Sequence, residues 1–308
     1  MKSIVLIFPY FGQLPVQFGI WKASAINNPT IDFMFFTDTD VEPANNLIVH
    51  KMQFCDFQKI VQKAFDIPIV LDRPYKLCEY KQAYGYILQD YIKNYDFWGF
   101  GDLDLVYGDI RYFINDDILA KHSFFLGWGH LTILKNCEDC NTYFMKEVPG
   151  FQSYKDAFST SKITFFDEFN HQGCSDKWKD CRPQECWLED PFDNVSKPKQ
   201  AYHFCSLNRG WKQVIFEYTN KKLYIIRFKN GITERKESLY AHFQHRPFMK
   251  DLVEDYNHFI ITPNGAIDYP KYFTTIKLRY YCRKRRFMTK YYQWKDRIIW
   301  KLGKSYYR

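Results

Sequence analysis

The chain has 308 residues, 46% of them hydrophobic and 25% charged, which suits a globular enzyme of one large α/β domain or two smaller ones. Its first residues contain no secretory signal, and no apolar run reaches the length of a transmembrane helix. These features exclude secreted and membrane-spanning classes from the prediction and favour a cytoplasmic protein. The formal charge of +8 is uneven, because residues 277–308 carry twelve Lys or Arg and one acid, which leaves −3 for residues 1–276.

Two buried strands are predicted at the start of the chain. Residues 4–8 form an apolar run that ends at Pro9-Tyr10-Phe11-Gly12, and an apolar, helix-like stretch follows it through Trp21. Residues 31–36 form a second apolar run, which leads into Thr37-Asp38. Strands that are apolar on both faces and alternate with helices are typical of a parallel sheet, which binds ligands at the carboxyl ends of its strands. We therefore expect a ligand site near Tyr10, Phe11, Thr37 and Asp38.

An amphipathic helix and a third buried strand precede an acidic turn. Residues 75–93 have apolar side chains at helical spacing, and residues 95–101 are an apolar run. The run ends in Gly101-Asp102-Leu103-Asp104, whose two carboxylates can reach one divalent cation. Asp-x-Asp alone is a weak signal, since a solvated turn is its usual explanation, but its position after a buried strand favours a metal site. Mg²⁺ or Mn²⁺ at this turn would bridge a diphosphate and neutralise it as it leaves.

The second half of the chain has less periodicity. Residues 150–200 are rich in polar residues, Cys, Pro and Trp, and are predicted to form loops and short helices that shape a cleft. Residues 224–228 and 239–243 are predicted to form a hairpin that turns at Lys229-Asn230-Gly231. The nine cysteines are predicted to be small buried hydrophobes, because the spacing of Cys137 and Cys140 from the later cysteines fits a structural zinc site poorly.

A late histidine segment, His242-Phe243-Gln244-His245-Arg246-Pro247, adds two candidate ligands. A neutral imidazole can complete the coordination of the cation, and the adjacent Arg246 can hold a pyrophosphate. A lone His is more often structural, but the pair of aspartates favours the ligand role for His242. His245 is predicted to be structural or surface-exposed.

The aspartate turn followed much later by the His242 segment resembles the DxD and late His-Phe…Pro elements of GT-A glycosyltransferases, especially the glycogenin and lipopolysaccharide galactosyltransferase group. Over about residues 4–250 the chain is also similar to an uncharacterised family of bacterial capsule and lipopolysaccharide glycosyltransferases. The segments that carry this similarity are Pro9-Tyr10-Phe11-Gly12-Gln13-Leu14-Pro15, Thr37-Asp38, Tyr75-Lys76-Leu77-Cys78-Glu79-Tyr80-Lys81, the Asp102 turn, Gly129-His130, Phe166-Asp167-Glu168 and the His242 segment. The late segment lacks the usual Gly and the Lys-Pro-Trp ending, and the basic tail lies outside the resemblance.

The resemblance implies a Rossmann-like, nucleotide-sugar-binding GT-A fold, in which a mixed sheet is flanked by helices. Asp102, Asp104 and His242 would bind the metal, and Arg246 would bind the pyrophosphate by analogy. The similarity to the glycogenin group favours retention of anomeric configuration. The nucleoside would be held by Pro9, Tyr10, Phe11, Gly12, Thr37 and Asp38.

Four further residues receive roles from the same resemblance. Lys76 and Lys81 would reach donor phosphate or sugar hydroxyls, and a solvated helix face is the alternative explanation for both. Asp167 and Glu168 would lie near the acceptor, where a carboxylate is the general base of an inverting enzyme or orients the sugar of a retaining one. An exposed surface pair is the alternative for these two acids.

The basic tail mixes aromatic and charged residues at helical spacing. Trp294, Ile298 and Leu302 can form one face of a helix and Lys and Arg another, which is typical of an interfacial helix on anionic lipid. The aromatic share of 20% also suits sugar recognition or a membrane interface, although an AT-rich genome produces the same excess. RNA is the competing partner for the tail, but the acidic remainder and the lack of a nucleic-acid module favour the membrane.

These observations predict a catalytic domain over residues 1–276 and a helical tail, residues 277–308, that associates with the inner face of the cell membrane. We expect a metal-dependent glycosyltransferase that transfers a sugar from a UDP-linked donor to a lipid-linked oligosaccharide in bacterial surface polysaccharide synthesis, with no nucleic-acid partner. A metal-dependent nucleotidyl- or phosphotransferase is the alternative enzyme, although neither GxGxxG nor a P-loop is present. A carbohydrate- or lipid-binding protein is the alternative without catalysis. Donor sugar, acceptor, linkage, anomeric outcome and oligomeric state stay open.

Overall fold

The computed structural model describes residues 1–230, 232–244, 246 and 251–302. The chain divides into two compact units made of interleaved segments. Unit 1 consists of residues 1–14, 29–102 and 114–189, and unit 2 consists of residues 15–28, 103–113 and 190–308. The predicted catalytic range therefore contributes to both units, and the predicted tail belongs to unit 2.

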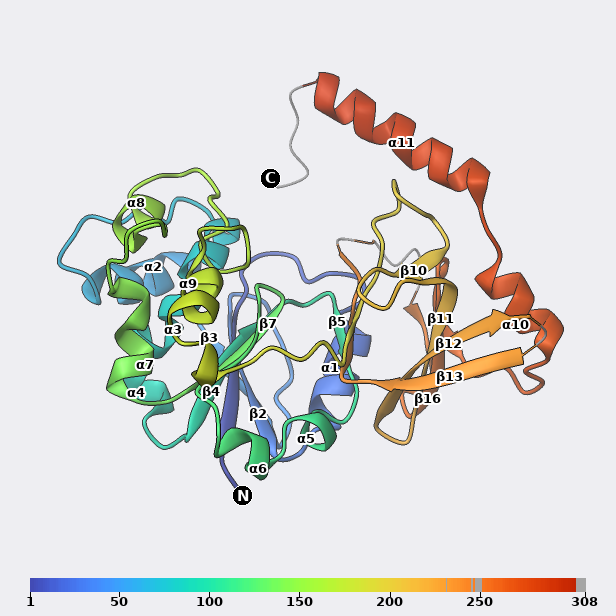
Figure 1. The fold of residues 1–308 in the computed structure, drawn as a ribbon, viewed down its shortest axis with the longest axis horizontal. Helices are drawn as coiled ribbons and strands as arrows, with labels where there is room; N and C mark the ends of the chain where they lie inside the picture. Colours follow the sequence, from blue (N-terminus) through green and yellow to red (C-terminus); the bar gives the residue numbers. More distant parts are fainter. Residues whose placement is uncertain (231, 245, 247–250, 303–308) are drawn as a thin grey trace. The chain divides into compact units, whose positions relative to one another are not determined.

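Unit 1 is built on a mixed seven-stranded sheet with the strand order β3-β2-β1-β4-β7-β6-β8 (Figure 1). The first four strands in this order are parallel, β7 is antiparallel to β4, and β6 is antiparallel to β7 and parallel to β8. The predicted strands at residues 4–8, 31–36 and 95–101 are confirmed as β1, β2 and β4. The strands are β1 (Ile4–Pro9), β2 (Ile31–Thr37), β3 (Leu47–Lys51), β4 (Phe97–Gly101), β6 (Phe124–Trp128), β7 (Leu131–Lys135) and β8 (Cys186–Trp187).

Alternate residues of the central strands build the main core of unit 1. Val5 and Ile7 of β1 and Trp98 and Phe100 of β4 are fully buried in it, as expected for side chains two residues apart on one face of a sheet. Helices α2, α7 and α9 cover this face and add Phe57, Cys140 and Trp178 to the core (Figure 1). The helices of unit 1 are α2 (Phe54–Lys63), η1 (Pro74–Ala83), α3 (Tyr84–Ile87), α4 (Gln89–Ile92), α6 (Asp116–Leu119), α7 (Glu138–Thr142), η2 (Tyr143–Met145), α8 (Tyr154–Phe158), α9 (Cys174–Cys181) and η3 (Pro183–Glu185).

Two predictions for unit 1 hold in part. Residues 75–93 are helical, as predicted, but they form the 3₁₀-helix η1 and the short helices α3 and α4 instead of one α-helix. The predicted irregular region, residues 150–200, contains the short helices α8 and α9 and strands of two residues. The α/β class, with mixed sheets flanked by helices, is thus confirmed.

Unit 2 contains a second sheet, in the order β13-β12-β11-β16-β17-β15, with β10 paired to β11. All of these pairs are antiparallel except β15 with β17. Its core joins Ile20 of α1 to sheet residues such as Phe216, Ile225 and Phe259. The elements of this unit are α1 (Phe18–Ile26), β5 (Leu105–Tyr107), α5 (Ile110–Phe113), β9 (Asp193–Asn194), β10 (Phe204–Ser206), β11 (Trp211–Thr219), β12 (Lys222–Lys229), β13 (Ile232–Ser238), β14 (Tyr240–His242), β15 (Asp251–Leu252), β16 (His258–Thr262), β17 (Gly265–Asp268), α10 (Thr275–Cys282) and α11 (Arg286–Lys301).

The predicted hairpin has the right first strand but the wrong partner. Residues 224–228 lie in β12, which pairs with β13 so that Lys229 is opposite Ile232. Residues 240–242 form β14, which joins β5 and β9 in a separate three-stranded sheet. The strand β13 was missed because four consecutive charged residues, 234–237, hide its alternation at the edge of the sheet.

The two C-terminal helices differ in how they are packed. Leu278 and Cys282 bury one face of α10 against Ile215 and Ile226 of the sheet. In α11 no residue is buried. Within the described residues, no helix combines the length and the apolar character needed to cross a membrane.

Candidate functional site

The sheet of unit 1 reverses its strand order at β1. The chain adds β2 and β3 on one side of β1 and then places β4 on its other side. Ligands of open α/β sheets bind outside the carboxyl ends of the strands at such a point. Residues after Pro9 and after Gly101 therefore leave the sheet from neighbouring parallel strands, at the edge where a ligand is expected.

The loops after β1 and β2 are tied together by hydrogen bonds. The backbone N–H of Gly12 donates to Asp38 Oδ1 at 2.8 Å, and Thr39 Oγ1 donates to the carbonyl of Gly12 at 2.8 Å. Gly12 has a φ of +96°, a conformation that favours glycine. These contacts hold the Pro9–Gly12 loop and Asp38 as one rigid rim.

The other predicted nucleoside ligands differ in whether their side chains lie on the rim or are buried behind it. Tyr10 lies on the rim, with its hydroxyl donating to the carbonyl of Gln13 at 3.1 Å. Phe11 is packed inside unit 1 against Phe54 and Phe57, and Thr37 is fully buried. The side chains of Phe11 and Thr37 thus pack behind the rim, and a contact of either residue with a nucleoside stays a prediction.

Lys81 brings together three groups from distant parts of unit 1. Its ammonium lies 2.6 Å from Asp102 Oδ1, 2.7 Å from the carbonyl of Gly129 and 3.6 Å from Asp167 Oδ2. Burial opposes the charge of Lys81, but Asp102 and Asp167 more than offset this effect and hold the pKa of Lys81 well above its ordinary value. Lys81 is therefore a fixed positive charge beside Asp102.

Asp167 and Glu168 adjoin the same cluster. Burial raises the pKa of Asp167 to about 8, although Lys81 acts in the opposite direction. Gly129 leaves room for both acids, because a Cβ atom there would lie 2.9 Å from Asp167 Oδ2 and 3.1 Å from Glu168 Cβ. The predicted acceptor-side acids thus lie next to the predicted donor-side lysine.

A row of polar side chains on η1 holds the segment that carries these acids. Side chains three residues apart align in a 3₁₀-helix, and Lys76, Glu79 and Gln82 have this spacing. Glu79 accepts from the backbone N–H groups of Thr164 and Phe165, both at 2.8 Å. Gln82 Nε2 donates to the carbonyl of Asp167 at 2.8 Å and to Ser175 Oγ at 3.2 Å.

Lys76 belongs to this structural row. It is 0% exposed, its ammonium donates to the carbonyls of Ala157 and Lys162 at 2.9 and 2.6 Å, and Glu79 lies 3.8 Å away. The ammonium thus has two carbonyl acceptors and a buried carboxylate as its counter-ion. The position of Lys76 gives no support to the predicted phosphate contact, and we leave it out of the site.

In unit 2, strand pairing sets His242 beside Asp104. His242 lies opposite Leu105 of β5, and the N–H of Phe243 donates to the carbonyl of Asp104 at 3.0 Å. His242 Nε2 is 3.5 Å from Asp104 Oδ1, and Nδ1 is 3.1 Å from Asn194 Oδ1. Since an amide oxygen only accepts, Nδ1 carries a proton and Nε2 is the nitrogen that can bind a metal.

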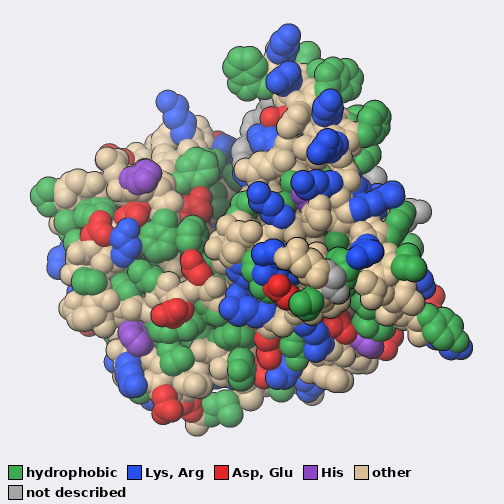
Figure 2. Space-filling view, turned by 45° about the vertical axis from the view of Figure 1, so that its right-hand side comes forward, with side chains coloured by type: hydrophobic (Ala, Val, Ile, Leu, Met, Phe, Trp, Pro, Cys, Tyr) green, Lys and Arg blue, Asp and Glu red, His purple; other side chains and the backbone are tan. Residues whose placement is uncertain are grey.

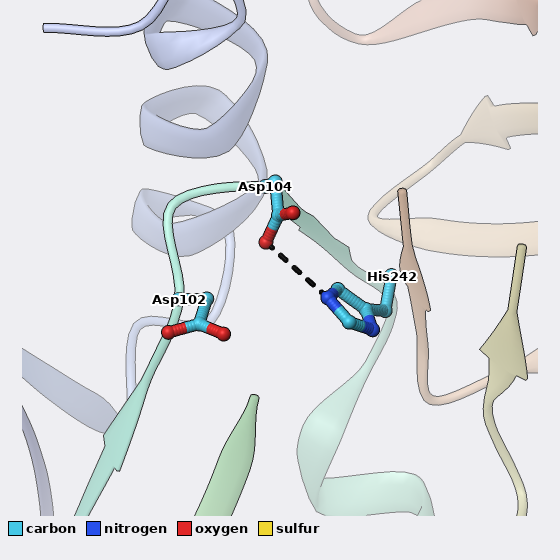
Figure 3. A group of neighbouring side chains, drawn as sticks. All are labelled: Asp102, Asp104 and His242. Atoms are coloured by element: carbon cyan, nitrogen blue, oxygen red, sulfur yellow. Dashed lines mark ion pairs between the residues drawn. The ribbon is translucent and has the colours of Figure 1, made fainter. Parts of the chain in front are cut away.

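Asp102 completes a group with the donor chemistry of a metal site. Ligand atoms of Asp102, Asp104 and His242 lie within 4.8 Å of one another, and Figure 3 shows Asp104 and His242 facing each other. Asp102 is the last residue of its unit 1 segment and precedes Asp104 by two residues in the chain. Two carboxylates and an imidazole that donates its other N–H to an amide oxygen fit a divalent cation.

Arg246 has a different environment from the predicted one. It is 4% exposed, Nε donates to the carbonyl of Ser196 at 2.7 Å, Nη1 donates to that of Tyr202 at 2.9 Å, and Nη2 donates to that of Ala201. Burial lowers the pKa of Arg246 to about 10. The side chain clamps the loop of residues 196–202, so its position does not support the predicted pyrophosphate contact. His245 lies outside the described residues.

A known family covers most of the chain. The model of DUF6625, a family of unknown function, matches residues 6–270. The chain belongs to the DUF6625 family. Among curated proteins, none matches it. The range matched by DUF6625 includes Asp102, Asp104, Asp167 and His242 and ends before α10 and α11.

Asn194 is the residue of the site that the sequence did not indicate. Its side-chain oxygen accepts from His242 and also from Gln244 Nε2, so it orients the imidazole. Asn194 occupies a two-residue strand with no local pattern, and only its pairing with β14 brings it to His242. A single sequence carries no signal for such a contact.

Proposed function

We propose that this DUF6625 protein is a metal-dependent glycosyltransferase of GT-A type that uses a UDP-linked sugar donor. The observation that supports this proposal best is the group of Asp102, Asp104 and His242 just after the carboxyl end of β4. The reversal of strand order between β1 and β4 supports a nucleotide site at the same edge. The rim of residues 9–12 and Asp38 is the part of unit 1 that would contact the nucleoside.

The cation would be held by Asp102, Asp104 and His242. Carboxylates suit Mn²⁺ and Mg²⁺, and an imidazole ligand favours Mn²⁺ of the two. When bound, the cation would supply Lewis-acid stabilisation of a departing diphosphate. Lys81 would add a positive charge of the protein itself, since its ammonium is already fixed beside Asp102.

Asp167 and Glu168, in the segment between α8 and α9, would have different tasks. Because burial raises its pKa to about 8, Asp167 would donate a hydrogen bond to a sugar or leaving-group oxygen in its protonated form, and in its ionised form it pairs with Lys81. Glu168 is the less buried of the two. It would orient an acceptor hydroxyl or take its proton.

The acceptor in this proposal is a lipid-linked oligosaccharide of bacterial surface polysaccharide synthesis, at the inner face of the membrane. The resemblance of the segments between residues 9 and 247 supports this choice, and so does the basic tail. The proposal includes no nucleic-acid partner.

Calorimetric titration of UDP and UDP-sugars into the purified protein, with Mn²⁺ or with EDTA, tests the donor site. We expect binding that requires the metal and that Asp104→Asn weakens by about tenfold or more, because contacts of charged groups contribute about 1.5–3 kcal/mol. Asp117→Asn is the matched control, since Asp117 is exposed in the short helix α6. It should bind like the wild type.

The other outcomes separate the alternative functions. Release of sugar 1-phosphate, instead of UDP, from a UDP-sugar would indicate a nucleotidyltransferase, because transfer of the UMP group breaks the link between the two phosphates. Carbohydrate binding that EDTA and Asp104→Asn leave unchanged would indicate a protein without catalysis. If sugar donors linked to UDP, GDP, CMP and dTDP all fail to bind in the presence of every divalent metal tested, the glycosyltransferase proposal is wrong.

A further inference from the structure

The helix α11 contacts unit 2 through its polar side. The backbone N–H of Tyr202 donates to Thr289 Oγ1 at 3.0 Å, and Gln293 Nε2 donates to the carbonyl of Lys199 at 3.1 Å. The ammonium of Lys199 pairs with Asp296 at 3.1 Å. A surface helix normally buries its apolar side, so this arrangement is reversed.

These contacts fix which way the helix faces. Tyr292 stacks on Tyr202 with ring centroids 5.6 Å apart, and with Thr289, Gln293 and Asp296 it forms one face at three- and four-residue spacing. The loop under this face is itself held by Arg246, whose guanidinium donates to the carbonyl of Tyr202. The loop that α11 packs on is therefore itself held in place by hydrogen bonds from Arg246.

The opposite side of α11 is an apolar stripe that faces outward. With 3.6 residues per turn, the stripe lies about half a turn away from the contact face. Phe287, Trp294 and Leu302 in it are 80%, 62% and 63% exposed. Figure 2 shows hydrophobic side chains among Lys and Arg on this projecting part of the surface. The stripe consists of Phe287, Tyr291, Trp294, Ile298 and Leu302.

Positive charge borders the stripe. The helical spacing puts Arg286, Lys290, Arg297 and Lys301 along one edge and Lys295 along the other. The single acid of the helix, Asp296, is on the contact face and paired with Lys199.

We propose that this outward face of α11 lies in the interface of an anionic lipid bilayer. The stripe would enter the region between headgroups and acyl chains, and the bordering Lys and Arg would contact lipid phosphates. Charge complementarity selects this occupant. A second copy of the chain would bring the same positive charge to the contact, and RNA would leave the apolar stripe in water. The inference does not depend on the proposed enzymatic function.

Flotation of the full chain with lipid vesicles tests the inference. We expect binding to phosphatidylcholine vesicles that contain phosphatidylglycerol and little binding to phosphatidylcholine alone. Trp294→Ser should weaken binding on the order of tenfold, because it removes a large side chain from the lipid-facing stripe. Trp300→Ser is the matched control, since Trp300 is 81% exposed but lies off the stripe, and it should change binding little.

Several results would overturn the inference. They are equal losses in the two tryptophan variants, equal binding to neutral and anionic vesicles, and no binding to either. Self-association or RNA binding that Trp294→Ser abolishes, without vesicle binding, would assign the face to another partner. The variants leave the core intact, because no α11 residue is buried. UDP binding, measured in the same samples, shows separately whether the proposed function holds.

Discussion

Asp167 is buried and lies in the candidate site. Its protonation should therefore have a measurable effect on the free energy of unfolding. In the unfolded chain an Asp has a pKa of about 3.9. In the folded protein, burial raises the pKa of Asp167 to about 8. Between these values the folded protein holds a proton that the unfolded chain has lost, so the free energy of unfolding falls as the pH rises from about 4 to about 8.

Replacement of this acid should remove its part of the pH dependence. Each unit of difference between the two pKa values corresponds to about 1.4 kcal/mol. We expect Asp167→Asn to become more stable relative to the wild type as the pH rises from about 5 to about 8. Urea unfolding in EDTA at both pH values measures this change. Asp117→Asn should keep the wild-type pH dependence, and an unchanged dependence in Asp167→Asn would contradict the assignment.

The residues of the candidate site differ in how far the sequence predicted them. Asp102, Asp104 and His242 were predicted from their chemistry and from the end of an apolar strand, and the structure brings their ligand atoms together. Lys76 and Arg246 were chosen for their charge. Both are buried, and their donors are taken up by backbone carbonyls, which a local sequence pattern does not reveal.

At the scale of elements, η1 connects the sheet edge to the Asp167 segment. Its side chains at positions 76, 79 and 82 all bond to residues between 157 and 175. The sequence predicted an α-helix here because its apolar residues recur at three- and four-residue spacing. The 3₁₀-helix instead aligns Lys76, Glu79 and Gln82 on one side. The residues that these three side chains contact are distant from them in the chain.

Glu79 is the residue of this row whose loss should cost most. Glu79→Ala removes the acceptor of two backbone N–H groups and leaves the ammonium of Lys76 without its carboxylate. We expect the free energy of unfolding, measured in urea, to fall by about 3–5 kcal/mol. Adding Lys76→Met should restore part of the loss, because the buried charge is then gone. A double variant that loses the sum of both single effects would show that the two side chains are not coupled.

The strands show the same limit of local patterns. The strands β1, β2 and β4 are buried on both faces, and continuous apolar runs of this kind are visible in the sequence. The edge strand β13 is mostly exposed, so its sequence lacks the run of apolar residues by which a buried strand is recognised. It pairs with β12 over residues 232–238, whereas residues 240–242 pair with β5 and β9.

At the scale of the whole molecule, the C-terminal helices separate into a structural and a peripheral part. The sequence placed the start of the tail at residue 277, but Leu278 and Cys282 of α10 are buried in a core with Ile215 and Ile226. Only α11 has no buried residue, and it also follows the end of the DUF6625 match. A boundary near residue 285 therefore agrees better with the packing of unit 2.

Deletion of residues 286–308 should for this reason remove lipid binding and little else. We expect the truncated chain to keep the melting temperature and the metal-dependent UDP affinity of the full chain, because the contacts that residues 286–302 make with unit 2 include surface hydrogen bonds, an ion pair and a ring stack but no buried side chain. Leu278→Ala in the full chain is the contrasting variant, and should lower the free energy of unfolding by about 2–5 kcal/mol while vesicle binding persists. Thermal unfolding, calorimetry and flotation of both proteins check these expectations. A truncated chain that unfolds at a much lower temperature would mean that α11 stabilises unit 2, and one that still floats with anionic vesicles would move the lipid contact to another surface.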